Sequence, residues 1–293
     1  MAAPSLSVWL LAARPKTLPA AISPVLIGAA LAIGDLQFAL VPTLAAMLAA
    51  LLIQIGTNYA NDYFDFAKGT DTDTRLGPTR VTHAGLVTPA QMKRAIVMVF
   101  GLALVIGLYL VIRSGWPILV IGLLSILFGI LYTGGPYPLG YNGLGDIFVL
   151  VFFGPVAVAG TYFVSTHGFS WIAVAAGFVP GLFSVAILTV NNLRDIDTDC
   201  AGGKRTLAVR FGRIFSLWEF GLCVIIPHFV TIILCLQESR WLGMLAVVMI
   251  VPSAMLIAKV VRSEGAALNS ALASTGKLLF AHSLLLSVGW ILI

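Results

Sequence analysis

The sequence predicts an all-α, polytopic membrane protein with about nine transmembrane helices bundled around a central cavity that is open to the cytoplasmic side. Hydrophobic residues make up 59% of the chain and charged residues only 10%, whereas charged residues make up about 25% of a typical soluble domain. The mean hydropathy is +1.02. Together with long apolar runs that recur along the chain, these values indicate a protein that lies in a lipid bilayer.

The predicted spans follow one another with short connections, and each is near the length of about 20 residues that crosses a bilayer as a helix. They cover residues 17–34, 38–58, 93–112, 116–132, 146–165, 171–191, 214–236, 241–261 and 277–293. The first is short, and Pro24 could kink it, but membrane helices tolerate proline. We expect residues 1–293 to form a single transmembrane domain, because only two loops are long and polar.

The basic residues indicate how the chain is oriented. With the N-terminus in the cytoplasm, 15 of the 17 Lys and Arg residues fall on the cytoplasmic side, and only Arg113 and Arg240 fall outside. This asymmetry is typical of inner loops and supports the span assignment. The net charge of +5 is too small to suggest a nucleic-acid partner, and the three cysteines have no disulfide or metal spacing.

Asn and Asp residues gather where the second predicted span enters its cytoplasmic loop, in the motif of residues 58–73. Asn58 precedes Asp62 by four residues, and Asn61 precedes Asp65 by four. Residues four apart share one face of a helix, so these side chains form a stripe if the helix continues through Asp65. Gly69 is expected to end that helix, which places Asp71 and Asp73 in a loop.

A second stripe follows the sixth predicted span, in the motif of residues 191–205. Asn191, Asp195 and Asp199 are spaced by four residues. If the helix continues through Asp199, these three side chains share a face with Asn192. Asp197 and Arg194 are then expected to point elsewhere.

Two carboxylate stripes at one membrane face predict a site for hard cations, because carboxylates crowded into one cavity repel each other unless cations neutralise them. Oxygen ligands suit Mg²⁺, which binds through a few carboxylates and substrate phosphates. Lys68, Lys204 and Arg205, with Arg210, could pair with the remaining phosphate charge. The alternative without a functional site is that each stripe is a solvated helix end and that the basic residues only set the membrane topology.

The segments NDYFDFAKGTD and NNLRDIDTDCAGGKRTLAVRFG resemble the two aspartate-rich motifs of the UbiA superfamily of intramembrane prenyltransferases. The segments RLGPTRVTHAGLVTPAQMKRA and PLGYNGLGDIFVLVFFG resemble the subfamily that prenylates 1,4-dihydroxy-2-naphthoate in menaquinone biosynthesis. The resemblance implies nine transmembrane helices, Mg²⁺, and polyprenyl diphosphate as the donor. It also implies loss of CO2 and diphosphate, demethylmenaquinone as the product, and location in a bacterial inner membrane with the active-site loops in the cytoplasm.

The resemblance also implies roles for particular residues. The implied catalytic residues are Asp65, Asp195 and Asp199. The implied metal ligands are Asn61, Asp62, Asp65, Asn191, Asp195 and Asp199. From their polarity and position beside these motifs, we expect four residues to bind the diphosphate: Asn58, Lys68, Lys204 and Arg205. Gly69 occupies the fourth position of the first motif, so Asp71 is a candidate to complete that site.

The acceptor side is less defined by the sequence. Its candidates are Tyr63, Tyr132, Asp146, Asn192 and Asp71. The Gly- and Pro-rich stretch 132–146 either lines a flat aromatic pocket or simply turns between helices, and Asp146 is either a helix N-cap or an acid–base group.

Other functions stay open on the sequence. One is prenylation of another acceptor, such as 4-hydroxybenzoate, homogentisate or haem. Another is an ion-coupled carrier with the aspartates as cation sites, although carriers place such charges nearer the bilayer midplane. A passive scaffold would leave the paired stripes unexplained.

Overall fold

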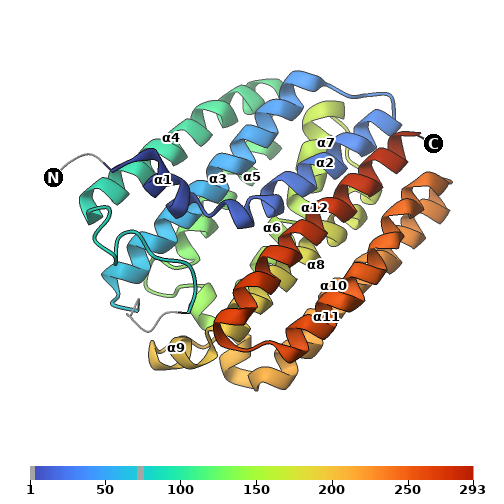
Figure 1. Ribbon diagram of the computed structural model, residues 1–293. Coiled ribbons are helices and arrows are strands. Elements are labelled where there is room, and N and C mark those ends of the chain that lie inside the picture. The colour runs from blue at the N-terminus through green and yellow to red at the C-terminus, as the bar shows by residue number, and fades with distance from the viewer. Residues whose placement is uncertain (1–3, 71–75, 293) are drawn as a thin grey trace.

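The computed structural model describes residues 4–70 and 76–292, and all regular structure in these ranges is helical (Figure 1). The α-helices are α1 (Leu6–Ala13), α2 (Pro19–Gly34), α3 (Leu40–Ala67), α4 (Pro89–Ser114), α5 (Trp116–Leu131), α6 (Gly145–Phe152), α7 (Pro155–Thr166), α8 (Trp171–Arg194), α9 (Ile196–Ala201), α10 (Leu207–Gln237), α11 (Ile250–Arg262) and α12 (Leu268–Leu292). Four 3-10 segments join them: η1 (Pro15–Thr17), η2 (Gly140–Asn142), η3 (Trp241–Met249) and η4 (Gly265–Ala267).

Each predicted span coincides with helical structure, and the all-α membrane fold is confirmed. Within the described ranges, seven helical segments are long and apolar enough to cross a bilayer. An eighth is obtained if α2 is counted with the N-terminal segment, which meets it at a bend of 56°. The structure does not confirm the count of nine, because α5 has only 16 residues and would extend about 24 Å.

The break between α6 and α7 comes from close packing against α8. A Cβ atom on Gly154 would lie 2.7 Å from the carbonyl oxygen of Gly177, and one on Gly177 would lie 2.5 Å from Pro155 Cα. Only glycine allows the two backbones to approach this closely, as small residues do at membrane-helix interfaces. Pro155 then starts α7, where its missing N–H is not needed.

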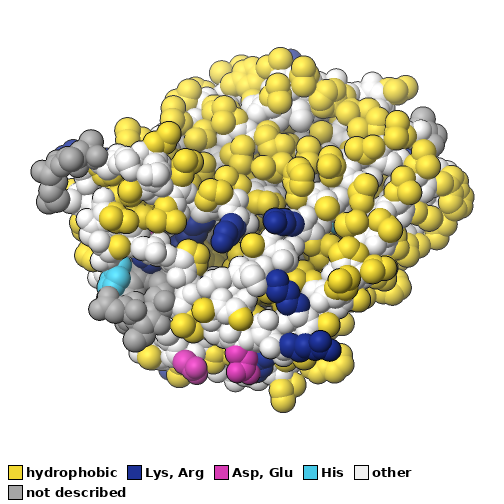
Figure 2. Space-filling view, in the orientation of Figure 1, with side chains coloured by type: hydrophobic (Ala, Val, Ile, Leu, Met, Phe, Trp, Pro, Cys, Tyr) yellow, Lys and Arg dark blue, Asp and Glu magenta, His cyan; other side chains and the backbone are white. Residues whose placement is uncertain are grey.

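Helix α8 lies at the centre of the bundle. It packs against α10, α12, α7, α6 and α2, and 67% of its most apolar window is buried. The outer helices present apolar side chains instead, and hydrophobic groups cover most of the face in Figure 2. This distribution is expected when lipid rather than water surrounds the bundle.

The C-terminal ends of α3 and α8 lie at the same end of the bundle, near α9 and the loop that precedes α4 (Figure 1). Helix α3 continues past Asp65 and ends at Ala67, and Gly69 follows with a φ of +66°, as predicted. Helix α8 ends earlier than predicted. Asp195 leaves the helical conformation with φ −102° and ψ 14°, and α9 carries Asp199 after the break.

Candidate active site

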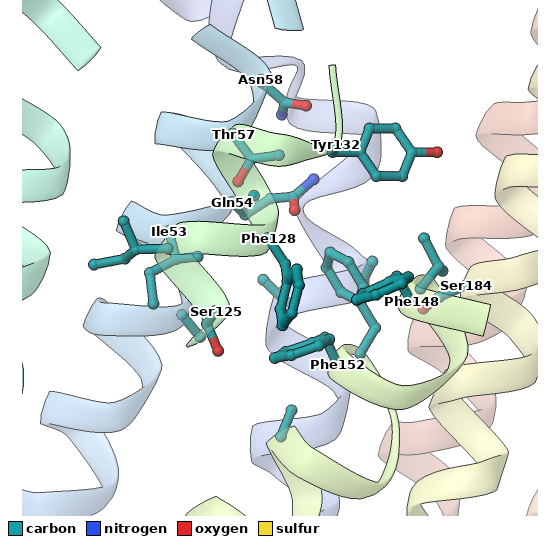
Figure 3. Close-up of a pocket in the computed structure, with 18 of the residues that line it drawn as sticks. Ile53, Gln54, Thr57, Asn58, Ser125, Phe128, Tyr132, Phe148, Phe152 and Ser184 are labelled. Carbon is teal, nitrogen blue, oxygen red and sulfur yellow. The ribbon is translucent and has the colours of Figure 1, made fainter. Parts of the chain in front are cut away.

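A cavity of about 610 Å³ runs between α2, α3, α4, α5, α6, α7 and α8. Its apolar part contains Phe128, Phe148 and Phe152, whose rings contact one another. Figure 3 shows these rings below Gln54, Asn58 and Tyr132, which begin the polar part (Figure 3). The cavity therefore offers a polar end and an aromatic, apolar end to one ligand.

Asp65 lies at the polar end and is only 1% exposed. Its carboxylate accepts hydrogen bonds from the Arg80 guanidinium and the Tyr141 hydroxyl, and Lys204 Nζ lies 4.0 Å from Oδ1. Thr70 also donates to this carboxylate, at 3.4 Å. Cations and hydroxyls from three loops thus converge on one buried aspartate.

The second motif supplies two further carboxylates to the same cavity. Arg194 donates two hydrogen bonds to the Asp195 carboxylate, from Nε to Oδ1 at 2.8 Å and from Nη2 to Oδ2. Asp199 pairs with Lys204 at 3.1 Å. Burial raises the pKa of Asp199 above its usual value, while Lys204 opposes that shift. Burial thus disfavours the ionised form of Asp199, and an added cation would favour it.

The charges that line the cavity balance. Its lining includes the acids Asp65, Asp195 and Asp199 and the bases Arg14, Arg80 and Lys204. Within the described ranges, no three acidic, His or Cys side chains are gathered as ligands of one metal ion, and each of the three acids is paired with a base. The oxygens of these carboxylates and of the asparagine amides that line the cavity are ligands of the kind that suits a hard divalent ion.

The amide residues of both motifs reach the cavity. Asn58, Asn61, Asn191 and Asn192 line it, as does Tyr132. Asn58 also donates to the Ala13 carbonyl at 2.9 Å, which ties α3 to the N-terminal segment. Asn61 accepts from Thr133 at 2.8 Å. The two predicted stripes therefore meet in space, even though the second is broken at Asp195.

Asp62 is not part of the cavity lining, and the structure gives it another role. Its two carboxylate oxygens accept the backbone N–H groups of Val81 and Thr82 at 3.1 and 3.0 Å. Residues three apart on a helix differ by about 60° in direction, so Asp62 faces this loop while Asp65 faces the cavity. The structure therefore does not place Asp62 at the cavity, where a metal ligand was expected.

Four other predicted residues also lie outside the lining. Tyr63 packs against a separate apolar cluster, and Lys68 donates to the Thr133 carbonyl at 2.7 Å. Arg205 is exposed. Asp146 is buried in the first turn of α6 but is not its N-cap, which is Leu144. Asp71 and Asp73 lie outside the described residues.

The sequence reasoning missed three residues that organise the site. Arg80 and Tyr141 bind Asp65, although they lie in loops far from either motif. Arg194 was expected to point away, but the chain leaves the helix at Asp195 and lets this guanidinium fold back onto Asp195 and Asn191. The available signal was a basic residue, Arg194, next to Asp195 within the second motif. Asp197 is exposed, as expected.

The chain is an all-α membrane bundle in which two aspartate-bearing helix ends line one amphiphilic cavity. These features are typical of a class of intramembrane enzymes. The chain matches the UbiA prenyltransferase family over residues 21–285 and belongs to it. This membership leaves the carrier and scaffold alternatives without support.

Similar proteins include the 1,4-dihydroxy-2-naphthoate octaprenyltransferase of Escherichia coli (strain K12). It is 38% identical over 257 residues, which cover 84% of this chain and 83% of that protein. The enzyme of the same name from Mycobacterium tuberculosis (strain ATCC 25618 / H37Rv) is 41% identical over 71% of each chain. Among solved structures, a UbiA homolog from Archaeoglobus fulgidus bound to GPP and Mg²⁺ has the same fold. Its TM-score is 0.71 at 12% identity, with coverage of 98% of this chain and 100% of that one.

Proposed function

We propose that the protein transfers a polyprenyl group from polyprenyl diphosphate to 1,4-dihydroxy-2-naphthoate, with loss of CO2 and diphosphate, and so forms demethylmenaquinone. One observation carries this proposal: a single cavity joins three buried carboxylates to an aromatic, apolar channel. An ionic head and an isoprenoid tail need these two environments side by side. The relatives named above support the naphthoate acceptor.

Magnesium fits the polar end. Asp65, Asp195 and Asp199 would hold it, with help from the amide oxygens of Asn61 and Asn191. Each of these carboxylates is already paired with a base, namely Arg80, Arg194 or Lys204. Divalent cations would supply the further positive charge that a diphosphate needs. When bound, Mg²⁺ acts as a Lewis acid that stabilises the diphosphate leaving group.

The protein's own side chains place the reacting groups. Lys204, Arg80 and Arg14 line the polar end and stabilise negative charge on the departing diphosphate through preorganised donors. The carbon–oxygen bond of the allylic diphosphate breaks, and the carboxylated ring carbon of the acceptor forms the new carbon–carbon bond. Departure of CO2 returns an electron pair to the ring, which restores its aromaticity.

The apolar end protects this step from water. Phe128, Phe148 and Phe152 surround the space next to the polar end and would pack against the isoprenoid chain. Leu104 of α4 and Leu119 of α5 also line the cavity and are 49% and 45% exposed. We propose that a long chain extends between these helices toward the lipid, and that the site faces the cytoplasm of a bacterium.

A purified enzyme assay tests the function. Protein supplied with Mg²⁺, a polyprenyl diphosphate and carboxyl-labelled dihydroxynaphthoate is expected to release diphosphate and labelled CO2 in equal amounts. Asp65→Asn and Asp195→Asn should each abolish turnover, with Asp197→Asn as the exposed control in the same motif. Turnover with 4-hydroxybenzoate but not with the naphthoate would contradict the acceptor assignment.

A further inference from the structure

Tyr141 lies in the short η2 segment between α5 and α6 and lines the polar end of the cavity. The loop that carries it folds back on the end of α5, where Gly140 N–H donates to the Tyr132 carbonyl at 2.9 Å. Neither aspartate motif contains this residue. Its position on a loop anchored to the bundle allows one side chain to meet both motifs.

Two ammonium groups lie near the Tyr141 ring. Lys68 Nζ, from the first motif, and Lys204 Nζ, from the second, are each 4.8 Å from the ring centroid. That distance is within the range in which the negative face of an aromatic ring attracts a cation. Two positive groups that would otherwise repel each other are thus gathered at one neutral ring.

The polar groups of Tyr141 contact the same two motifs. Its hydroxyl donates to Asp65 and lies 3.1 Å from Thr70 Oγ1, and its carbonyl accepts the Arg205 N–H at 2.7 Å. The residue therefore touches side chains of the first motif through its hydroxyl and the backbone of the second through its carbonyl.

We propose that Tyr141 is a positioning residue that sets the two halves of the diphosphate site relative to each other. The ring holds the ammonium group of Lys204 at the cavity, with the Lys68 ammonium group at the same ring but outside the cavity lining, and the hydroxyl orients Asp65. This inference rests on the proposed binding of a prenyl diphosphate at the polar end. The ring is expected to affect diphosphate binding, and the hydroxyl is expected to affect turnover and the Mg²⁺ requirement.

Two substitutions separate these parts. Tyr141→Phe removes the hydroxyl and keeps the ring, so kcat should fall and the Mg²⁺ concentration for half-maximal activity should rise, with little change in KM for the diphosphate. Tyr141→Leu also removes the ring, and KM for the diphosphate should rise about tenfold beyond that of Tyr141→Phe, as expected for loss of a desolvated cation–π contact. KM for the naphthoate should stay within about twofold in both.

Binding provides a readout that needs no acceptor. Calorimetry with an unreactive prenyl thiodiphosphate should show the same rise in Kd for Tyr141→Leu. In a double-mutant cycle, Lys204→Gln should weaken binding about three- to thirtyfold less in the Tyr141→Leu background than in the wild type. The control cycle pairs Lys204→Gln with Tyr137→Leu, which changes an exposed tyrosine of the same loop, and it should be additive.

The results decide between this role and a merely structural one. If Tyr141→Leu unfolds, phenylalanines of increasing fluorination at position 141 keep the shape and weaken the ring's attraction for cations, and Kd should rise stepwise. Equal Kd values for Tyr141→Phe and Tyr141→Leu, or a flat fluorination series, would overturn the proposal. Wild-type turnover with the naphthoate is scored separately, so failure of the acceptor assignment would be recognised as such.

Discussion

Arg194 is expected to be one of the most sensitive positions in the protein. Its side chain is 0% exposed, and it donates to Asp195 through two atoms and to Asn191 and Asn269 at 2.8 Å each. Asn269 in turn donates to the Leu76 carbonyl at 2.8 Å. The guanidinium therefore joins the second motif to α12 and, through it, to the loop after α3.

The cost of Arg194→Met follows from these contacts. The substitution keeps an apolar stem but leaves the Asp195 carboxylate, only 6% exposed on its side chain, without its cation, and such a loss costs about 3–5 kcal/mol. At about 2–4 °C per kcal/mol for a domain of this size class, Tm should fall by about 6–20 °C. Arg213→Met removes two 3.0 Å hydrogen bonds to the carbonyls of Val261 and Ser263 and a 3.9 Å pair with the exposed Glu264. It should cost about 1–2 kcal/mol, less than Arg194→Met, because this side chain is 33% exposed and water can replace the lost partners.

A second variant separates charge from packing. Arg194→Met combined with Asp195→Asn removes the uncompensated charge, so it should recover at least half of the lost Tm while remaining inactive. Thermal unfolding in detergent at one fixed scan rate measures all four proteins, because membrane proteins unfold irreversibly. A Tm for Arg194→Met equal to that of Arg213→Met, or a double variant no more stable than the single one, would refute the reasoning.

Four further outcomes are expected. Asp62→Asn should destabilise the protein by about 1–3 kcal/mol through its bonds to the amides of residues 81–82, and limited proteolysis should show faster cleavage there. Since the pKa of Asp199 is raised in the fold, its ionised form costs stability at higher pH. Metal-free Asp199→Asn should therefore have a higher Tm than wild type at pH 8, and the difference should vanish as the pH falls toward about 4. Phe152→Trp should reduce kcat/KM about tenfold more for an octaprenyl than for a geranyl diphosphate, because a larger ring narrows the apolar end. Cys200, the exposed cysteine, should react with an impermeant maleimide in inverted but not in right-side-out vesicles if α9 faces the cytoplasm.

Much of the architecture could be predicted because the bilayer imposes a simple pattern. A spanning helix must be apolar over its length, so residues 38–58 and 171–191 were recognisable. Residues 40–58 lie in α3 and residues 171–191 in α8. The stripe of Asn61 and Asp65 was recognisable for a related reason. Polar side chains four apart at the end of an apolar helix are unfavourable in lipid, so they are expected to face the interior of the bundle. Helix α3 continues past Asn61 and Asp65.

Other features depended on loops, whose paths follow from contacts rather than from periodicity. Asp62 stands between Asn61 and Asp65, which line the cavity, yet it binds the backbone of residues 81–82. The break at Asp195 turned Arg194 inward. No periodic pattern in the sequence predicts the contact of Asp62 or the inward turn of Arg194, since both depend on segments that are distant in sequence.

Hydropathy and helical spacing are local properties of the chain, so the membrane-embedded helical bundle and its two acidic motifs could be predicted from the amino-acid sequence alone. How those motifs share one cavity follows from the packing of the helices and loops. Arg80 and Tyr141 bind Asp65 there, and Arg194 binds Asp195. These partners reach the two acids through the folding of loops and helix ends. Buried charge must find a partner wherever the fold can bring one, and no local pattern specifies which residue that will be.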